Sequence, residues 1–193
     1  MSVQLEVLQI GPAKSEGDLM DSIIYNTNEI QKLTAIMVKL TQLLLEEKVS
    51  YDEFVNISLK YDNKLSSSLE LRELYNKRIQ EDATVNLREL ETVLENKELL
   101  IVRKNIGDMQ EDEYEIKLAA LNWDINKMHN SAEYLKKCLN LIKTLPNQID
   151  SSDASYINEL SKDEYKTIKK TKLSTECKKR LIKNINAISK ILS

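Results

Sequence analysis

Apolar residues recur at helical spacing along most of this chain. From Asp18 onward, every seventh residue of the first segment is apolar: Ile23, Ile30, Met37 and Leu44. This repeat predicts a helix over residues 18–48. A second stripe runs unbroken through four heptads at spacings of three and four: Leu118, Leu121, Ile125, Met128, Ala132, Leu135, Leu139 and Ile142. The second stripe predicts coiled-coil packing, and we expect the chain to self-associate through it.

Three short sequences predict helix starts. Ser50 precedes Glu53 by three residues, the spacing of a capping box in which each side chain bonds to the other residue's backbone N–H. Ser161 and Glu164 repeat this spacing, and residues 109–114 form a looser copy. Acidic side chains in a first turn also interact favourably with the positive end of the helix dipole. Capping explains these carboxylates better than the alternative, an acidic motif recognised by a partner.

The stretches between these starts predict where helices break. Residues 50–106 contain neither Gly nor Pro, but polar residues near 81–85 predict a break or a bend, with Asp82 or Thr84 capping the second part. Pro146 then predicts a helix end, followed by a polar linker over residues 145–157. Beyond it we expect a short helix, a turn and a final helix.

The fold class predicted from these patterns is all-α. Only three Gly and two Pro occur in 193 residues, so few turns are expected. Residues 1–17 are a single strand or a flexible segment, residues 18–144 an antiparallel helical bundle or coiled-coil rod, and residues 145–157 the linker. Residues 158–193 are a small, basic, helix-turn-helix-like module.

No arrangement of residues typical of an enzyme is present. The single histidine, His129, has no second His or nearby Cys to complete a metal site, and the acidic pairs lie at helix starts. We therefore expect no catalytic, cofactor-binding or metal-binding residues and a protein that is not an enzyme. Cys138 and Cys177 lie far apart, which indicates free thiols in a reducing cytoplasm. No apolar run is long enough to cross a membrane, and the amino terminus lacks the features of a signal peptide.

Charge is unevenly distributed along the chain. The net charge is −3, but residues 156–193 carry ten basic against four acidic residues. The basic residues expected to contact a partner or an anion are Lys169, Lys170, Lys172, Lys178, Lys179, Arg180 and Lys183. Apolar residues in the same segment favour docking to protein over nucleic acid, and nucleic acid over an anionic membrane surface.

Residues 102–117 resemble the capped corners of several coiled-coil families, among them coiled-coil segments of archaeal division proteins that recruit membrane-remodelling filaments. This resemblance implies a third possibility, a scaffold or accessory protein at a membrane surface. The favoured hypothesis is a non-catalytic structural or adaptor protein that self-associates through its coiled-coil body and engages a partner through its basic module. The alternative is a nucleic-acid-binding protein that uses the same basic tail. Trp123, opposite the stripe, indicates a second packing face or a partner contact.

Overall fold

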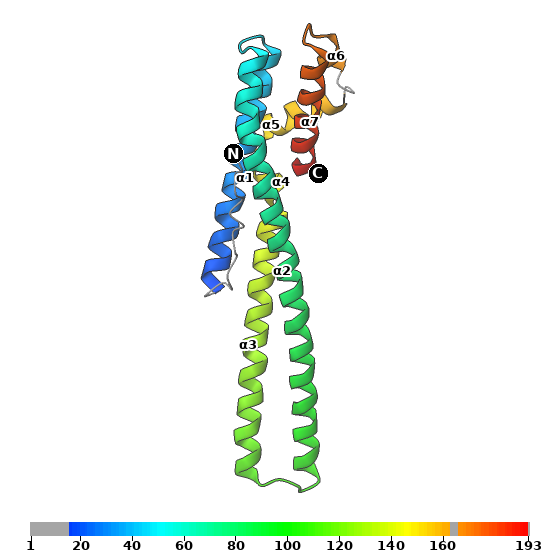
Figure 1. Ribbon diagram of the computed structural model, residues 1–193. Helices are drawn as coiled ribbons and strands as arrows, with labels where there is room; N and C mark the ends of the chain where they lie inside the picture. Colours follow the sequence, from blue (N-terminus) through cyan, green and yellow to red (C-terminus); the bar gives the residue numbers. More distant parts are fainter. Residues whose placement is uncertain (1–15, 163–165, 193) are drawn as a thin grey trace.

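The computed structural model describes residues 16–162 and 166–192, and over these residues the fold is all-α, as predicted (Figure 1). The described helices are α1 (Glu16–Leu45), α2 (Tyr51–Asn105), α3 (Glu111–Lys143), α4 (Leu145–Gln148), α5 (Ser151–Lys162), α6 (Lys166–Lys170) and α7 (Thr175–Leu192). Of the amino-terminal segment predicted as a single strand or a flexible stretch over residues 1–17, residues 1–15 lie outside the described residues and the last two belong to α1.

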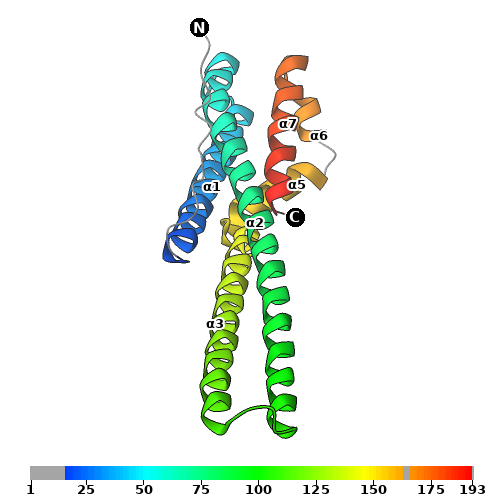
Figure 2. The same ribbon diagram turned by 60° about the horizontal axis from the view of Figure 1, so that its bottom comes forward.

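The helices form a base from which a two-helix arm projects (Figures 1 and 2). Helices α2 and α3 run antiparallel, joined by a turn in which Gly107 adopts a φ of 79°, a left-handed conformation that suits glycine. Helix α1 and the helices α4 to α7 pack around the other end of this hairpin. We call residues 86–132 the arm, because there α2 and α3 extend beyond the remaining helices.

Helix α2 is continuous through residues 81–85, so the break with a new cap that was predicted as one alternative there is absent. None of these residues is Gly or Pro, so none removes a backbone hydrogen bond from the helix. Thr84, a predicted cap, instead donates its hydroxyl to the Gln80 carbonyl oxygen at 2.8 Å. Its polar side chain is thereby satisfied inside the helix.

The capping box predicted at the start of α2 is confirmed. The Ser50 backbone N–H donates to Glu53 Oε2 at 2.8 Å, and the Glu53 N–H donates to Ser50 Oγ at 3.3 Å. Hydrogen bonds from the Ser50 hydroxyl and backbone lower the pKa of the Glu53 carboxyl. The looser copy also precedes a helix, α3, but its N-cap residue Gln110 makes no side-chain capping bond.

Residues 145–157 are helical except at Ile149 and Asp150, although a polar linker was predicted there. They form α4 and the first half of α5, and Leu145, Ile149 and Ile157 are buried. Asp150 starts α5 by accepting a hydrogen bond from the Ser152 backbone N–H at 2.8 Å. Three buried apolar side chains outweigh the polar composition that suggested a linker.

Ser161 was predicted to cap the start of a helix, but it lies within α5, one residue before the end of that helix. Its expected partner Glu164 lies outside the described residues.

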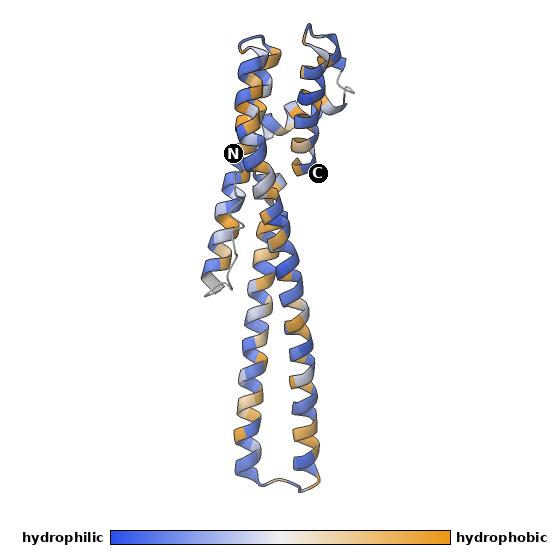
Figure 3. Ribbon diagram, in the orientation of Figure 1, coloured by the Kyte–Doolittle hydropathy of each residue, from blue (hydrophilic) through white to orange (hydrophobic). Residues whose placement is uncertain are grey.

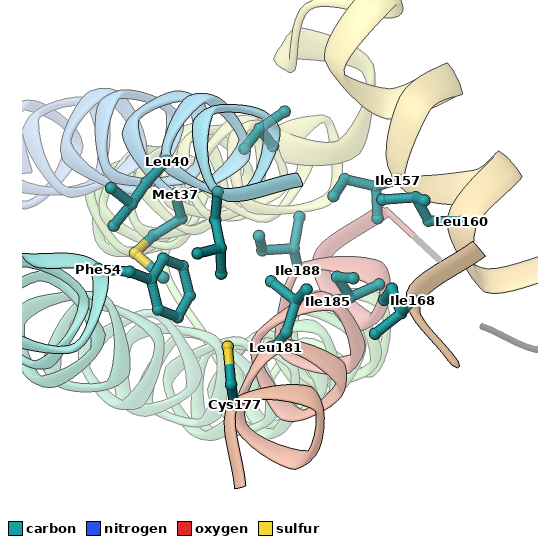
Figure 4. Packing of buried hydrophobic residues seen from close by; sticks show 12 residues of the cluster. Met37, Leu40, Phe54, Ile157, Leu160, Ile168, Cys177, Leu181, Ile185 and Ile188 are labelled. Atoms are coloured by element: carbon teal, nitrogen blue, oxygen red, sulfur yellow. The ribbon is translucent and has the colours of Figure 1, made fainter. Parts of the chain in front are cut away.

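The C-terminal helices share a core with α1 and α2 (Figure 4). Met37 of α1, Phe54 of α2, Ile157 of α5 and Leu181 of α7 are buried in one cluster. The segment predicted as a separate basic module is thus packed into the base, and the arm is the part that extends away from it.

Candidate interaction surfaces

The apolar stripe on α3 packs against α2 of the same chain. Leu135 and Ile142 are buried, most of the other stripe residues are half-buried, and Ala132 is exposed. The half-buried residues of the stripe are Leu118, Leu121, Ile125, Met128 and Leu139. On α2 the facing residues are also spaced three and four apart: Ala83, Asn86, Leu90, Val93, Lys97, Leu100 and Lys104. The stripe is occupied within one chain, so self-association of the chain would use another surface.

Three polar contacts fix the register of α2 against α3 in the arm. Asn86 Nδ2 donates to the Met128 carbonyl oxygen at 3.0 Å, and Lys97 Nζ donates to Asn122 Oδ1 at 2.9 Å. At the tip, Lys104 pairs with the carboxylate of Glu111. Polar residues at seam positions select one alignment of the two helices at some cost in stability.

Large apolar side chains outside this seam remain exposed on the arm. Figure 3 shows hydrophobic residues along both helices of the arm. On α3, Trp123 is 64% exposed and Ile116 is 72% exposed. The Lys127 ammonium lies 5.4 Å from the Trp123 ring centroid, within cation–π range. Among the described residues, Trp123 is not packed in a second face of the bundle, and a partner contact stays a prediction. The exposed apolar residues of α2 in the arm are Leu87, Leu94, Leu99, Ile101 and Val102.

The apolar residues of the C-terminal segment face the base. Ile185, Ile188 and Ile191 of α7 are buried, and Ile182 and Leu192 pack against the core cluster. These apolar residues were the reason to predict docking to another protein, but the chain uses them internally. The surface left on this segment is mainly basic.

Two of the seven predicted basic contact residues are engaged within the chain. Arg180 Nη2 lies 3.8 Å from Asp62 Oδ2, and Arg180 Nε donates to Ser58 Oγ at 3.3 Å. Burial raises the pKa of Asp62, although Arg180 and Lys183 attract its carboxylate. Lys178 Nζ donates to the Lys169 carbonyl oxygen at 2.9 Å, which ties α7 to α6.

The other five basic residues, Lys169, Lys170, Lys172, Lys179 and Lys183, are exposed. Within the described ranges none of them forms an ion pair with a carboxylate. They extend from α6 through the following turn onto α7, at the end of the base farthest from the tip of the arm (Figure 1).

The base contains a groove that was not predicted from the sequence. The groove lies between α1 and α2 and is lined by Tyr25 and Asn26 of α1 and by Leu71 and Leu74 of α2, among others. Tyr25 is 70% exposed although it lies on a helix that is otherwise well packed. The sequence does not predict this groove, because the spacing of Tyr25 and Asn26 does not show that one is exposed and the other is buried.

The structure also locates the remaining candidates for chemistry. His129 is exposed on the arm, and Cys138 and Cys177 are buried and form no disulfide. In the part of the chain that the structure describes, no three His, Cys, Asp or Glu residues are grouped as metal ligands. Among those same residues, no helix is both long enough and apolar enough to span a bilayer.

No family model matches this chain, and neither a curated protein nor a solved structure resembles it at a significant level.

Proposed function

We propose that this protein is a non-catalytic adaptor that self-associates through its arm and engages an acidic partner through the basic surface of α6 and α7. The observation that carries the proposal is the exposure of large apolar side chains along the arm, including Trp123 at 64% and Leu87 at 55%. Apolar side chains gathered on one projecting element are typical of protein interfaces. The compact base would hold the arm and the basic surface at opposite ends.

The location that fits this function is the cytoplasm. Cys138 and Cys177 are both buried, and neither forms a disulfide. Free cysteines of this kind are common in reducing compartments.

Light scattering coupled to size exclusion tests the self-association. One chain has a mass of 22.3 kDa. We expect a multiple of this mass at micromolar concentration, at both low and high salt, because apolar contacts are weakly affected by salt. A mass of one chain throughout the concentration series would refute the proposed self-association.

Nucleic-acid binding is the second candidate function, favoured by the five exposed lysines of α6, the turn and α7. Fluorescence anisotropy with a labelled DNA duplex tests it. We would expect binding that weakens steeply as salt rises. Binding should be lost in the variant Lys169→Glu/Lys170→Glu/Lys172→Glu and retained in a control, Lys60→Glu/Lys64→Glu, which changes exposed lysines of α2. Equal loss in both variants would mean that the basic surface is not the site.

A further inference from the structure

One flank of the arm carries a regular row of apolar side chains that none of the helices in residues 16–162 and 166–192 covers. Leu87, Leu94 and Ile101 lie seven residues apart on α2 and are 55%, 41% and 38% exposed. Each follows a seam residue by four positions, so the row borders the contact with α3. A two-helix coiled coil needs only the seam. An added apolar row beside it is typical of a helix that packs against more than one neighbour.

The row lies on the flank of α2 opposite to the one that α1 covers. In the base, Asn26 of α1 donates to the Ser68 carbonyl oxygen at 3.0 Å, and Leu19 of α1 packs in one cluster with Tyr75. Ser68 and Tyr75 are also seven residues apart, but their register is offset from the row by two residues. At 3.5 residues per turn, this offset turns about 200° around the helix.

The flank that α1 covers becomes polar in the arm. The sevenfold register of Ser68 and Tyr75 continues along α2 through Asp82, Glu89, Asn96 and Arg103. The apolar row therefore does not extend the binding site of α1. It is a separate surface that begins where the third helix of the base ends.

We propose that this row joins two copies of the chain, which pair arm to arm in antiparallel orientation as a four-helix bundle. The inference rests on the self-association proposed above and names the surface responsible. A two-fold axis near Leu94 would place Leu87 of one copy against Ile101 of the other, so that the row is self-complementary. The antiparallel arrangement also keeps the two bulky bases at opposite ends of the bundle.

The charges of α3 beside the row favour the same orientation. On this flank α3 carries four residues at sevenfold spacing: Glu115, Asn122, His129 and Lys136. The acidic end is at the tip and the basic end is toward the base, where Lys136 Nζ is 3.9 Å from exposed Glu133 of its own helix. With the axis near Leu94, antiparallel pairing places Glu115 of one copy near His129 of the other and Lys136 near the acidic tip of the other, whereas parallel pairing sets like charges together.

Cysteine cross-linking of the full chain tests the orientation. Leu94→Cys is expected to form a disulfide-linked dimer under mild oxidation, since the two copies of residue 94 face each other at the axis. A mixture of Leu87→Cys and Ile101→Cys should cross-link, and Ile101→Cys alone should not. The native Cys138 and Cys177 are buried and serve as the background. A cross-link formed by Ile101→Cys with itself, and not with Leu87→Cys, would overturn the antiparallel arrangement.

A matched pair of glutamate variants tests the row itself. Leu94→Glu is expected to weaken dimerisation roughly tenfold or more, because a carboxylate would be buried at the centre of the contact. Leu99→Glu makes the same change at a more exposed position of the same helix and should leave the dimer intact. Circular dichroism would show that both variants remain helical.

The failures of the two proposals are distinguishable. If the wild-type chain is a dimer and Leu94→Glu dimerises equally well, the row is not the contact, while self-association stands. If the wild-type chain is a monomer, both proposals are refuted.

Discussion

Lys97 Nζ lies 2.9 Å from Asn122 Oδ1, across the two helices of the arm, at a seam position where most neighbours are apolar. A lysine at such a position selects register and costs stability. Lys97→Leu is therefore expected to raise the unfolding free energy by about 1 kcal/mol, through added apolar burial against α3. Thermal unfolding followed by circular dichroism measures the change.

The control for this variant is Lys137→Leu, which replaces an exposed lysine of α3 outside the seam. It should change the melting temperature much less. A lower melting temperature for Lys97→Leu than for the wild-type chain would show that the bond to Asn122 is stabilising overall.

The capping box of α2 predicts a pH-dependent effect. Ser50→Ala removes the acceptor for the Glu53 N–H and should lower the unfolding free energy by about 1 kcal/mol. Glu53→Gln should also destabilise the chain at neutral pH, because the folded state lowers the pKa of this carboxyl. A lowered pKa means that the stabilisation is present above the unfolded pKa and is lost as pH falls through the folded one.

The difference in stability between wild type and Glu53→Gln should therefore disappear in acid, below the ordinary glutamate pKa of about 4.3. Denaturant titrations between pH 3 and pH 7 measure this difference. A constant difference across that range would contradict the assignment of Glu53 as an ionised cap.

The Arg180–Asp62 contact should have the opposite pH dependence. Burial raises the pKa of Asp62 despite the nearby cations, so ionising this side chain costs free energy in the folded state. Asp62→Asn is expected to keep or raise the melting temperature at pH 7. The gain should vanish below the unfolded pKa of about 3.9, where wild-type Asp62 is protonated in both states.

Glu70→Gln, at an exposed site of the same helix, is the control for charge removal alone. A fall of several degrees in the melting temperature of Asp62→Asn at pH 7, without one in the control, would mean that the ion pair is net favourable.

The segment predicted as a linker should contribute to global stability. Ile157 is fully buried between α5 and the rest of the base, so Ile157→Ala is expected to cost about 2–5 kcal/mol. The neighbouring exposed Asn158, changed to Ala, should cost much less. Equal and small effects of the two changes on denaturant unfolding would show that α5 does not belong to the core.

The sequence was sufficient to predict the features that depend on local spacing. The stripe from Leu118 to Ile142 and the capping box at Ser50 follow from the geometry of one helix, and both are present. The sequence did not reveal which helix covers the stripe, because a seam has the same pattern whether its partner is in the same chain or in another copy.

The errors have a common physical cause, since each depends on contacts between distant residues. Residues 145–157 are mostly polar, but Leu145, Ile149 and Ile157 among them are buried against α1 and α7. Leu145 and Ile149 are four residues apart, a spacing that could have predicted the single helical turn of α4. The exposed row at Leu94 was missed because nothing in its own spacing distinguishes a covered row from an uncovered one.

That one chain supplies both helices of the arm is tested most directly by a distance within a single molecule. Spin labels at Asn96→Cys and Ala120→Cys would lie on exposed positions of α2 and α3, away from the apolar row. Neighbouring helix axes are about 10 Å apart, and the label side chains add to this distance. Double electron–electron resonance should therefore give a separation of roughly 20 Å between the labels. If one chain supplies both helices, this short distance should persist when labelled protein is unfolded and refolded with a large excess of unlabelled chain. Loss of the distance on dilution would show that the coiled coil forms between chains, which would contradict the folded-back arm.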